Sequence, residues 1–541
     1  MGSKYFTYVK SIEELDDVIE TKEYGDQIDE GYCFKYNLEE YSILFSEDFP
    51  AVLPAIYMKK PRRHPHVSFD GIVCLNRIED IDFDIENIET VIRKTFNSFF
   101  NVMSLDSENF DYTYEFGDYI KYFKSFSKNM RVNVVQHFDF TKPHMTKMLK
   151  SDKFLYITDQ TIEKKYLNIK QSDLSQINVL FIPLKKYFSV PEIGSSLFTS
   201  EIIECIDSCH FSEVSEILKS KKPKCLFIAI KNVNGFYNCF CMQLNQSFSK
   251  ISENIEIINI YQVSNLTQNY LKARAGVFER KERILLIGLG SLGSEILYHL
   301  CKSGFDYVDI CDFDIIEPVN IYRHFLGYSN SFAIRDKKYF DLKKTEALKQ
   351  LMENRYPSVR INAFYDRIET LLKKELINLN EYDYIINATG NMISNRFLNN
   401  YMYKNNMKNN VIYSWIEPFG VALHIFTNRT SEYGCLNCLM LSSNKVFLAE
   451  EDNYVIQNDN CIGSFTKFGS LDVSRLAIET IKTIMDKKFE TRHKIILGDF
   501  QMFLNEGFKL TEYSKLSETQ LNNLGEDIVY EGCPICGSCN H

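Results

Sequence analysis

Apolar residues near the N-terminus recur at the spacing of a single helix face. At intervals of three and four, this stripe contains Ile85, Ile88, Ile92, Phe96, Phe99 and Met103. Such spacing predicts an amphipathic helix whose apolar face packs on a core. The preceding segment, SEDFPAVLPAIYMKKPRRHPHVSFDG, is rich in turn-forming residues and holds four prolines. We interpret residues 1–145 as a first domain.

Residues 146–272 show short apolar runs with one helical stretch among them. The runs INVLFIPL, KCLFIAI, NCFCMQL and IEIINIYQV predict strands, and SEVSEILKS predicts a helix. This alternation indicates a second domain of α/β type. Cys239 and Cys241 alternate with Phe240, as strand residues do, so core packing explains them better than chemistry. We find no chemical motif in this domain.

Length, charge and cysteine usage narrow the function classes. A chain of 541 residues is too long for one core. The formal net charge of −10 argues against direct nucleic-acid binding. The sequence contains no apolar run of membrane-spanning length and no signal-peptide pattern, which predicts a soluble, cytoplasmic protein. Fifteen scattered cysteines then favour thiols, metal ligands or catalysis over disulfides.

The third domain, residues 273–541, opens with a strand, a glycine-rich turn and a helix in RILLIGLGSLGSEILYHLCKSG. Gly288, Gly290 and Gly293 have the G-x-G-x-x-G spacing of nucleotide-binding loops. The helix N-terminus offers N–H groups to an anion. The next strand ends in Asp312 and Asp314, at a distance that suits ribose hydroxyls. A glycine loop alone does not distinguish NAD, FAD and ATP.

The segments that follow are more specific: DFDIIEPVNIYRHFLG, then KKTEALKQLMENRYPSV, then YDYIINATGNMISNR. With the glycine loop, this order resembles the activating-enzyme superfamily (ThiF/MoeB type), whose Rossmann-like domains adenylate a protein's C-terminal carboxylate with ATP. The resemblance implies that Asp314 holds the ribose, with Asp312 nearby. It implies that Asn320, Arg323 and Lys344 contact the ATP phosphates, and planar Arg and point-charge Lys suit that task. An NAD-dependent oxidoreductase fits this set less well.

One position departs from the superfamily pattern. Gly390, in NATGN, stands where these proteins usually have an aspartate that binds Mg²⁺. Asn391 and Asp312 are alternative Mg²⁺ ligands, and ATP and water are others.

Two C-x-x-C pairs lie in the same domain, Cys435 with Cys438 and Cys533 with Cys536. Two such pairs in an intracellular protein predict a four-sulfur Zn²⁺ site that is structural, because four thiolates close the coordination shell. The same arrangement recurs in the activating-enzyme superfamily. Unrelated thiols or a redox pair are the alternatives.

Cys461 is the only cysteine of the polar and glycine-containing stretch NDNCIGSF. A buried thiol is the default interpretation. Its loop-like surroundings indicate exposure instead. In ubiquitin-type activating enzymes a cysteine after the adenylation core takes the acyl group as a thioester. By resemblance, we assign that role to Cys461.

The stretch HPHVSFDGIVCLN then has a second interpretation. It resembles ubiquitin-conjugating enzymes, with an H-P-N-like motif followed by the catalytic cysteine, here Cys74. This implies an α+β fold for residues 1–145. His66 stands in place of the usual asparagine, and a histidine can donate one hydrogen bond to the same oxyanion. Zinc binding by His64, His66 and Cys74 is the competing hypothesis.

The combination resembles bacterial fusions of activating and conjugating enzymes found in CBASS antiphage systems. The resemblance implies a homodimer, an inactive adenylation-like domain at 146–272, and transfer of a cGAS-like nucleotidyltransferase's C-terminus to a target amine, such as a lysine. Arg274 would reach the neighbouring subunit's ATP. Two alternatives stay open: an activator of a ubiquitin-like or sulfur-carrier protein with a non-catalytic front domain, and an ATP-responsive binding scaffold.

Overall fold

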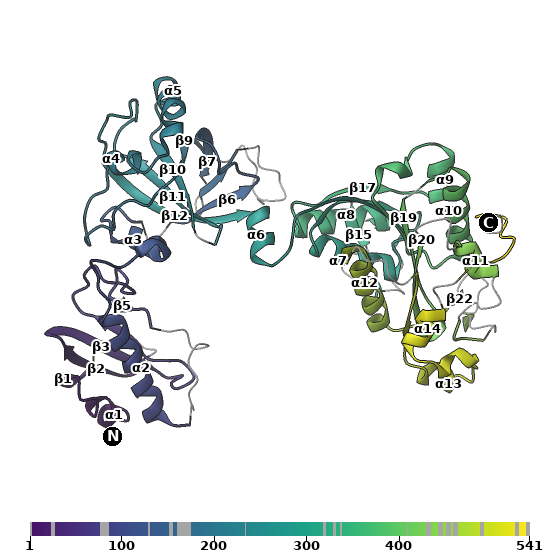
Figure 1. The fold of residues 1–541 in the computed structure, drawn as a ribbon, viewed down its shortest axis with the longest axis horizontal. Coiled ribbons are helices and arrows are strands. Elements are labelled where there is room, and N and C mark those ends of the chain that lie inside the picture. Colours follow the sequence, from purple (N-terminus) through teal and green to yellow (C-terminus); the bar gives the residue numbers. More distant parts are fainter. Residues whose placement is uncertain are drawn as a thin grey trace. The chain divides into compact units, whose positions relative to one another are not determined.

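The computed structural model divides the chain into two compact units, Met1–Tyr270 and Leu271–His541 (Figure 1). Among the described residues, no helix is both long enough and apolar enough to cross a membrane. The structure describes residues 3–22, 28–75, 86–127, 130–150, 155–159, 175–232, 234–316, 321–327, 332–335, 338–407, 409–428, 434–441, 447–450, 456–457, 464–486, 492–524, 528 and 530–536.

The first unit begins with a five-stranded antiparallel sheet in which neighbours in sequence are neighbours in space. The helix expected from the apolar stripe packs on this sheet and buries Ile92, Phe96 and Phe99. It begins at Ile88, capped by the Asn87 side chain. Ile85, the first residue of the stripe, lies outside the described residues. The elements are α1 (Phe6–Lys10), β1 (Asp16–Thr21), β2 (Ile28–Tyr36), β3 (Glu39–Ser46), β4 (Ala55–Met58), β5 (Ile72–Val73) and α2 (Ile88–Met103).

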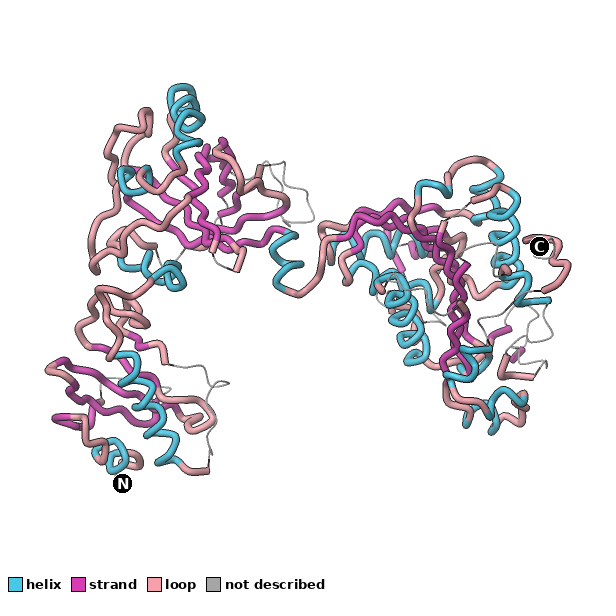
Figure 2. The backbone as a smooth tube through the Cα atoms, viewed as in Figure 1, coloured by secondary structure: helices cyan, strands magenta, loops and turns pink. Residues whose placement is uncertain are grey.

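The rest of the first unit is built on a closed barrel of seven strands. Figure 2 draws strands in magenta. Four of its pairings are antiparallel and three are parallel. The strands are β6 (Val132–Gln136), β7 (His144–Lys150), β8 (Leu155–Thr158), β9 (Ser175–Leu184), β10 (Cys225–Lys231), β11 (Tyr237–Leu244) and β12 (Ile257–Thr267). The helices are α3 (Phe116–Tyr119), α4 (Thr199–Ile203) and α5 (Phe211–Lys221).

This barrel differs from the α/β adenylation-like domain expected for residues 146–272. Long-range pairing of β6 with β12 and of β9 with β10 closes the sheet, and the strand pattern of the sequence does not reveal such pairing. The boundary expected at 145/146 falls inside β7. Cys239 and Cys241 do pack in the barrel interior, while Phe240 belongs to the cluster on the outer face.

The second unit is built on a seven-stranded sheet in the order β17-β14-β13-β18-β19-β20-β23. The first five strands are parallel, and the last two pairings are antiparallel. The strands are β13 (Arg280–Ile287), β14 (Phe305–Cys311), β17 (Arg360–Phe364), β18 (Tyr384–Asn387), β19 (Asn410–Ile416), β20 (Ala422–Asn428) and β23 (His493–Leu497). Among the described residues, two separate antiparallel pairs join β15 (Phe332–Arg335) to β16 (Lys338–Asp341) and β21 (Ile456–Gln457) to β22 (Ser464–Phe465).

Helices cover both faces of this sheet. One apolar cluster joins α7, α8 and α12 to one face, and another joins α9, α10 and α11 to the other. The parallel strands therefore form a doubly wound sheet whose order reverses between β13 and β18. The helices are α6 (Gln268–Arg274), α7 (Ser291–Lys302), α8 (Lys344–Arg355), α9 (Ile368–Lys373), α10 (Met392–Lys404), α11 (Leu436–Leu441), α12 (Ser470–Met485), α13 (Gln501–Asn505) and α14 (Glu518–Leu524).

Candidate nucleotide site and cysteine centres

A cavity of about 680 Å³ opens where the strand order of the second unit reverses. Residues that follow four parallel strands line it, namely Gly288, Asp312, Asp366 and Thr389. Ligands of doubly wound sheets bind at this position, outside the carboxyl ends of the strands. The volume is that of a cofactor-sized site.

The three glycines after β13 have different steric surroundings. Gly288 has a φ of +85°, and a Cβ there would lie 2.8 Å from the Thr389 backbone nitrogen. A Cβ at Gly293 would lie 1.9 Å from the Gly288 carbonyl oxygen. A Cβ at Gly290 would meet nothing within 4 Å, and Gly290 lines the cavity. Packing therefore requires the first and third glycines, while the second leaves the loop open to a ligand.

Asp312 and Asp314, which follow β14, have different hydrogen-bond partners. Asp312 is buried, and its carboxylate accepts hydrogen bonds from Leu289 N at 2.5 Å and Asp314 N at 2.8 Å. Burial raises the pKa of the Asp312 carboxyl. Lys344 Nζ donates to Asp314 Oδ2 at 3.0 Å, and Lys344 is only 9% exposed. Asp312 thus shapes the glycine loop, whereas Asp314 and Lys344 form a charge pair in the cavity wall.

Arg323 contacts the cavity wall from the side. Its guanidinium donates to the Thr466 carbonyl at 3.2 Å and stacks 4.3 Å from the centre of the Phe468 ring. Thr466 and Phe468 line the cavity. Burial lowers the pKa of the Arg323 guanidinium, although the group stays a cation at neutral pH. Asn320 lies outside the described residues.

The residues after β18 offer little to a metal ion. Gly390 has a φ of +63° and no side chain. Asn391 caps α10, and its Oδ1 accepts from Ile393 N at 2.8 Å and Ser394 N at 3.2 Å. Carboxylate oxygens are better suited to Mg²⁺. Among the described residues, the carboxylates that line the cavity belong to Asp312, Asp314, Asp366 and Glu369.

Sequence reasoning missed the stretch from Asp366 to Glu369, all of which lines the cavity. The Arg367 guanidinium lies 3.7 Å from the centre of the Phe313 ring, which links this stretch to the end of β14. The position of this stretch directly after a strand is the signal that could have identified it. Charged residues that directly follow a parallel strand lie at the same sheet edge as the glycine loop.

A buried chain of polar side chains also escaped sequence reasoning. His424 Nε2 donates to Glu417 Oε1 at 2.7 Å, and His493 Nε2 lies 3.0 Å from His424 Nδ1. Glu417 also accepts from Leu448 N and Ala449 N, at 3.0 and 2.8 Å. Burial, with the charge of His424, lowers the pKa of His493 well below its ordinary value of 6.5. This chain anchors residues 448–449 to the end of β19.

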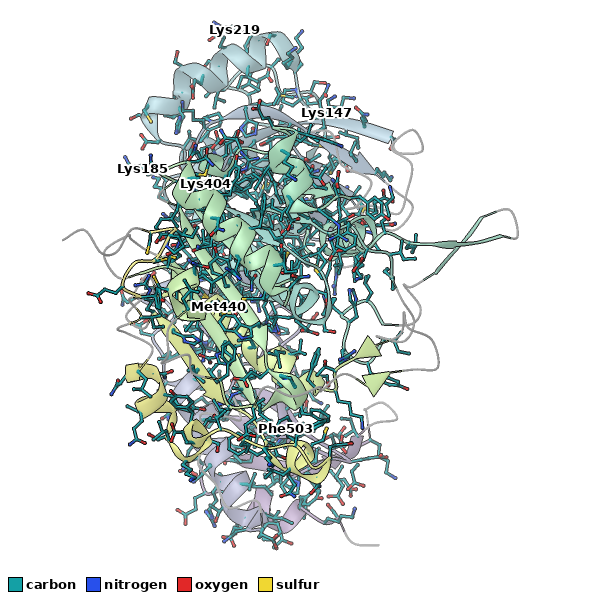
Figure 3. All side chains as sticks on the ribbon, turned by 90° about the vertical axis from the view of Figure 1, so that its right-hand side faces the viewer. Lys147, Lys185, Lys219, Lys404, Met440 and Phe503 are labelled. Carbon is teal, nitrogen blue, oxygen red and sulfur yellow. The ribbon has the colours of Figure 1, made fainter. Side chains whose placement is uncertain are left out.

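The four expected zinc ligands gather in one place. All four Sγ atoms lie within 4.8 Å of one another, with Cys435 and Cys533 at 3.8 Å and Cys438 and Cys536 at 3.4 Å. A tetrahedral site with Zn–S bonds of about 2.3 Å requires sulfurs about 3.8 Å apart. Cys438 lies on α11, the helix on which Figure 3 labels Met440.

Polar groups around this cluster suit thiolates. Asn399 Nδ2 lies 3.5 Å from Cys435 Sγ, and Asn437 Nδ2 lies 3.7 Å from Cys533 Sγ. The half-buried Arg492 guanidinium donates to the Gly434 carbonyl, beside the cluster. N–H donors and a cation offset the negative charge of four thiolates. The donor set therefore fits Zn²⁺, and it would tie α11 to residues 533–536.

The two cysteines of the expected relay are placed differently. Cys461 lies outside the described residues. Cys74 is exposed, directly after β5. Its backbone nitrogen donates to the His66 carbonyl at 2.6 Å, so residues 66 and 74 are adjacent. His66 has a φ of +58°, which is uncommon for a residue with a side chain. His64 is buried, with its Nδ1 2.9 Å from the Pro65 carbonyl.

Known proteins are similar to parts of this chain, and the family match lies within the second unit. Residues 278–507 match the model of the ThiF family. "Adenylyltransferase and sulfurtransferase UBA4" of Lodderomyces elongisporus is 24% identical over 176 residues, which are 32% of this chain and 36% of that protein. The "NEDD8-activating enzyme E1 catalytic subunit" of Arabidopsis thaliana is 35% identical over 117 residues, 22% of this chain and 23% of that protein.

A "Probable molybdopterin-synthase adenylyltransferase" of Porphyra purpurea is 32% identical over 112 residues, 21% of this chain and 27% of that protein. The matches thus span about a quarter to a third of these relatives. Among solved structures, Escherichia coli MccB overlaps 48% of this chain and 65% of its own, with a TM-score of 0.33 and 13% identity. The stretch that is similar to the ThiF family, residues 278–507, contains the glycine loop and the cavity.

Proposed function

We propose that this chain is an ATP-dependent enzyme that activates the C-terminal carboxylate of a partner protein. The observation that carries the proposal is the cavity at the switch point, which brings together the glycine loop, Asp314 and Lys344. The similarity to named adenylyltransferases supports it. A loop with exposed N–H groups and a lysine beside it suits a polyphosphate.

In the proposed first step a carboxylate oxygen of the partner attacks the α-phosphorus of ATP. A new C–O–P bond forms, the bond to the β-phosphate breaks, and pyrophosphate leaves. Both reactants are anions, so positive groups must offset their charge in the transition state. Lys344 and Arg323 would serve this purpose, with Asn320, and Asp314 would hold the ribose. Mg²⁺ would be held by ATP and by carboxylates of the cavity wall, of which Asp312 is already engaged by backbone N–H groups.

Two acyl transfers would follow. The Cys461 thiolate attacks the acyl carbon of the adenylate and AMP leaves, giving a thioester. The Cys74 thiolate then displaces Cys461, and an amine displaces Cys74 to give an amide. Each step exchanges one leaving group for another, so the overall acyl transfer is divided into easier reactions. The exposure of Cys74 and its contact with the His66 backbone support its place in this relay, with His66 as oxyanion donor.

The partner and setting are proposed from the resemblance to bacterial activating–conjugating fusions. The activated protein would be a cGAS-like nucleotidyltransferase, the acceptor a lysine amine, and the setting cytoplasmic antiphage defence of the CBASS type. The enzyme would act as a homodimer, with Arg274 of one subunit near the ATP of the other. Zn²⁺ on Cys435, Cys438, Cys533 and Cys536 would be structural.

The test is to incubate the protein with ATP and a candidate nucleotidyltransferase, and to separate the products on non-reducing gels. The proposal predicts pyrophosphate release and two thiol-sensitive adducts. Cys461→Ala abolishes both adducts, and Cys74→Ala leaves the first. Cys209→Ala, at another exposed cysteine, is the matched control and changes neither.

Other outcomes identify the rival functions. Pyrophosphate release with an adduct at Cys461 but none at Cys74, using a ubiquitin-like or sulfur-carrier protein, indicates an activator with a non-catalytic front domain. ATP binding without pyrophosphate release or any adduct indicates a binding scaffold.

A further inference from the structure

His324, next to Arg323, contacts the same residue of the glycine loop as Asp312. The side chain is buried, and its Nε2 lies 2.8 Å from the Leu289 carbonyl oxygen. Leu289 is the residue between Gly288 and Gly290, and its backbone N–H donates a hydrogen bond to the Asp312 carboxylate. One residue of the loop, Leu289, is thus held at both its N–H and its carbonyl oxygen.

The hydrogen bonds around His324 define a single tautomer. The Leu289 carbonyl can only accept, so Nε2 carries the proton. The Leu326 backbone N–H points to Nδ1 at 3.3 Å, so Nδ1 accepts. The imidazole is therefore neutral. Burial lowers the pKa of His324 to about 4, the Leu289 carbonyl opposes that shift, and the positive charge of Lys344 adds to it.

A second contact fixes the same segment on the helix that follows the loop. Phe325 N donates to Ser294 Oγ at 3.2 Å, and Ser294 Oγ donates to the Ser291 carbonyl at 3.0 Å. Residues 323–326 are therefore docked on both the glycine loop and the first turn of α7. Ser291 and Gly290 line the cavity, so this docking determines where the phosphate-facing backbone lies.

We propose that His324 is a positioning residue for nucleotide binding: through its Nε2 proton, it holds the glycine loop in the conformation that receives the phosphates of ATP. This inference rests on the proposed function. It gives His324 a role through the loop backbone, distinct from the direct phosphate contact proposed for Arg323. Without the Nε2 donor, the buried Leu289 carbonyl loses its partner and the loop loses one of its two anchors.

The test measures the dissociation constant of α,β-methylene-ATP, which cannot release pyrophosphate, by calorimetry on the full chain. We expect His324→Ala to weaken binding about tenfold, because a buried carbonyl is left without its donor. His324→Gln keeps an N–H donor and should bind within about threefold of the wild type. His299→Ala, on α7 and away from the loop, is the matched control and should bind like the wild type.

A separate readout does not depend on binding. Nitrogen NMR of ¹⁵N-histidine-labelled protein, assigned with the His324 variants, should show a protonated Nε2 and an unprotonated Nδ1 at neutral pH. Wild-type affinity in His324→Ala, equal losses in the Ala and Gln variants, or a proton on Nδ1 would each overturn the inference. A wild-type protein that does not bind the analogue at all refutes the proposed function instead, and the tautomer still shows whether His324 holds the loop.

Discussion

At the scale of single residues, the cavity contains a charge pair that packing alone does not explain. Lys344 is almost fully buried, while its partner Asp314 keeps a side chain that is 48% exposed. A half-exposed ion pair adds little to stability. Its position in the cavity wall supports the ligand-binding role that we propose for Lys344.

Replacing Lys344 with alanine should therefore affect chemistry far more than folding. We expect ATP–pyrophosphate exchange to fall about 10²–10³-fold, because a cation is lost where negative charge develops. The thermal midpoint should change little. Lys343→Ala is the matched control, because Lys343 pairs with Glu346 and stacks near Tyr365, and exchange should stay near wild type. Equal rates in the two variants would contradict the role given to Lys344.

The buried imidazoles predict a loss of stability in acid. Burial lowers the pKa of His324 to about 4, and that of His493 falls well below 6.5. A histidine with a lowered folded-state pKa favours the neutral form, so its stabilisation is present above pH 6.5 and is lost as pH falls toward 4. The free energy of unfolding from urea titrations should decrease between pH 6.5 and 4.5. His324→Gln should reduce that slope by at most about 1.4 kcal/mol per pH unit. An unchanged slope would show that His324 does not titrate in this range.

At the scale of elements, two glycines in the turn from β13 to α7 have different surroundings. Packing requires one of them, whereas the other faces the space that we propose for a ligand. Gly293→Ala would place a Cβ against the Gly288 carbonyl. Gly290→Ala would place one in the open space of the cavity. Both positions lie in the same motif, so the two variants form a matched pair.

We expect Gly293→Ala to lower the free energy of unfolding by about 1–3 kcal/mol, as overpacking does. Gly290→Ala should leave stability within about 0.5 kcal/mol, yet weaken binding of α,β-methylene-ATP, because its methyl group occupies ligand space. Urea unfolding and calorimetry measure the two effects. Wild-type affinity in the Gly290→Ala protein would show that the phosphates bind elsewhere.

At the scale of the whole molecule, the two units have separate cores. Apolar clusters of the first unit end at Val263, and those of the second begin at Ile284. Every described residue that lines the cavity falls between Ile287 and Phe468. A chain of residues 271–541 should therefore fold alone and bind α,β-methylene-ATP within about threefold of the full chain. A much weaker affinity would mean that the first unit contributes to the site.

The four-cysteine cluster joins α11 to residues 533–536 of the same unit. Metal analysis of the full chain should find about one zinc ion per chain. Cys536→Ser should lower that content markedly and reduce the thermal midpoint, because metal binding contributes to folding. Cys205→Ser, at a buried cysteine outside the cluster, should keep the zinc. Zinc content unaffected by Cys536→Ser would contradict the assignment.

Local signals in the sequence were sufficient for several features. The helix at 88–103 and the strand, turn and helix around Gly288 depend on spacing between neighbours in the chain, which is visible without a structure. The paired C-x-x-C motifs were another such signal, since thiol pairs at that spacing have few other uses, and all four sulfurs do meet in space. The roles given to Cys461 and Asn320 stay predictions, because both residues lie outside the described part of the chain.

Only the tertiary structure decided which distant segments meet. The sequence by itself determined the glycine loop, the acids after β14 and the pattern of strands and helices, because each is a matter of local spacing and propensity. It did not reveal that strands 132–136 and 257–267 pair in a closed barrel. Nor did it show that Asp366–Glu369 line the cavity, or that His324 holds Leu289. Those contacts join residues 35 or more positions apart, and their formation depends on packing of the whole unit.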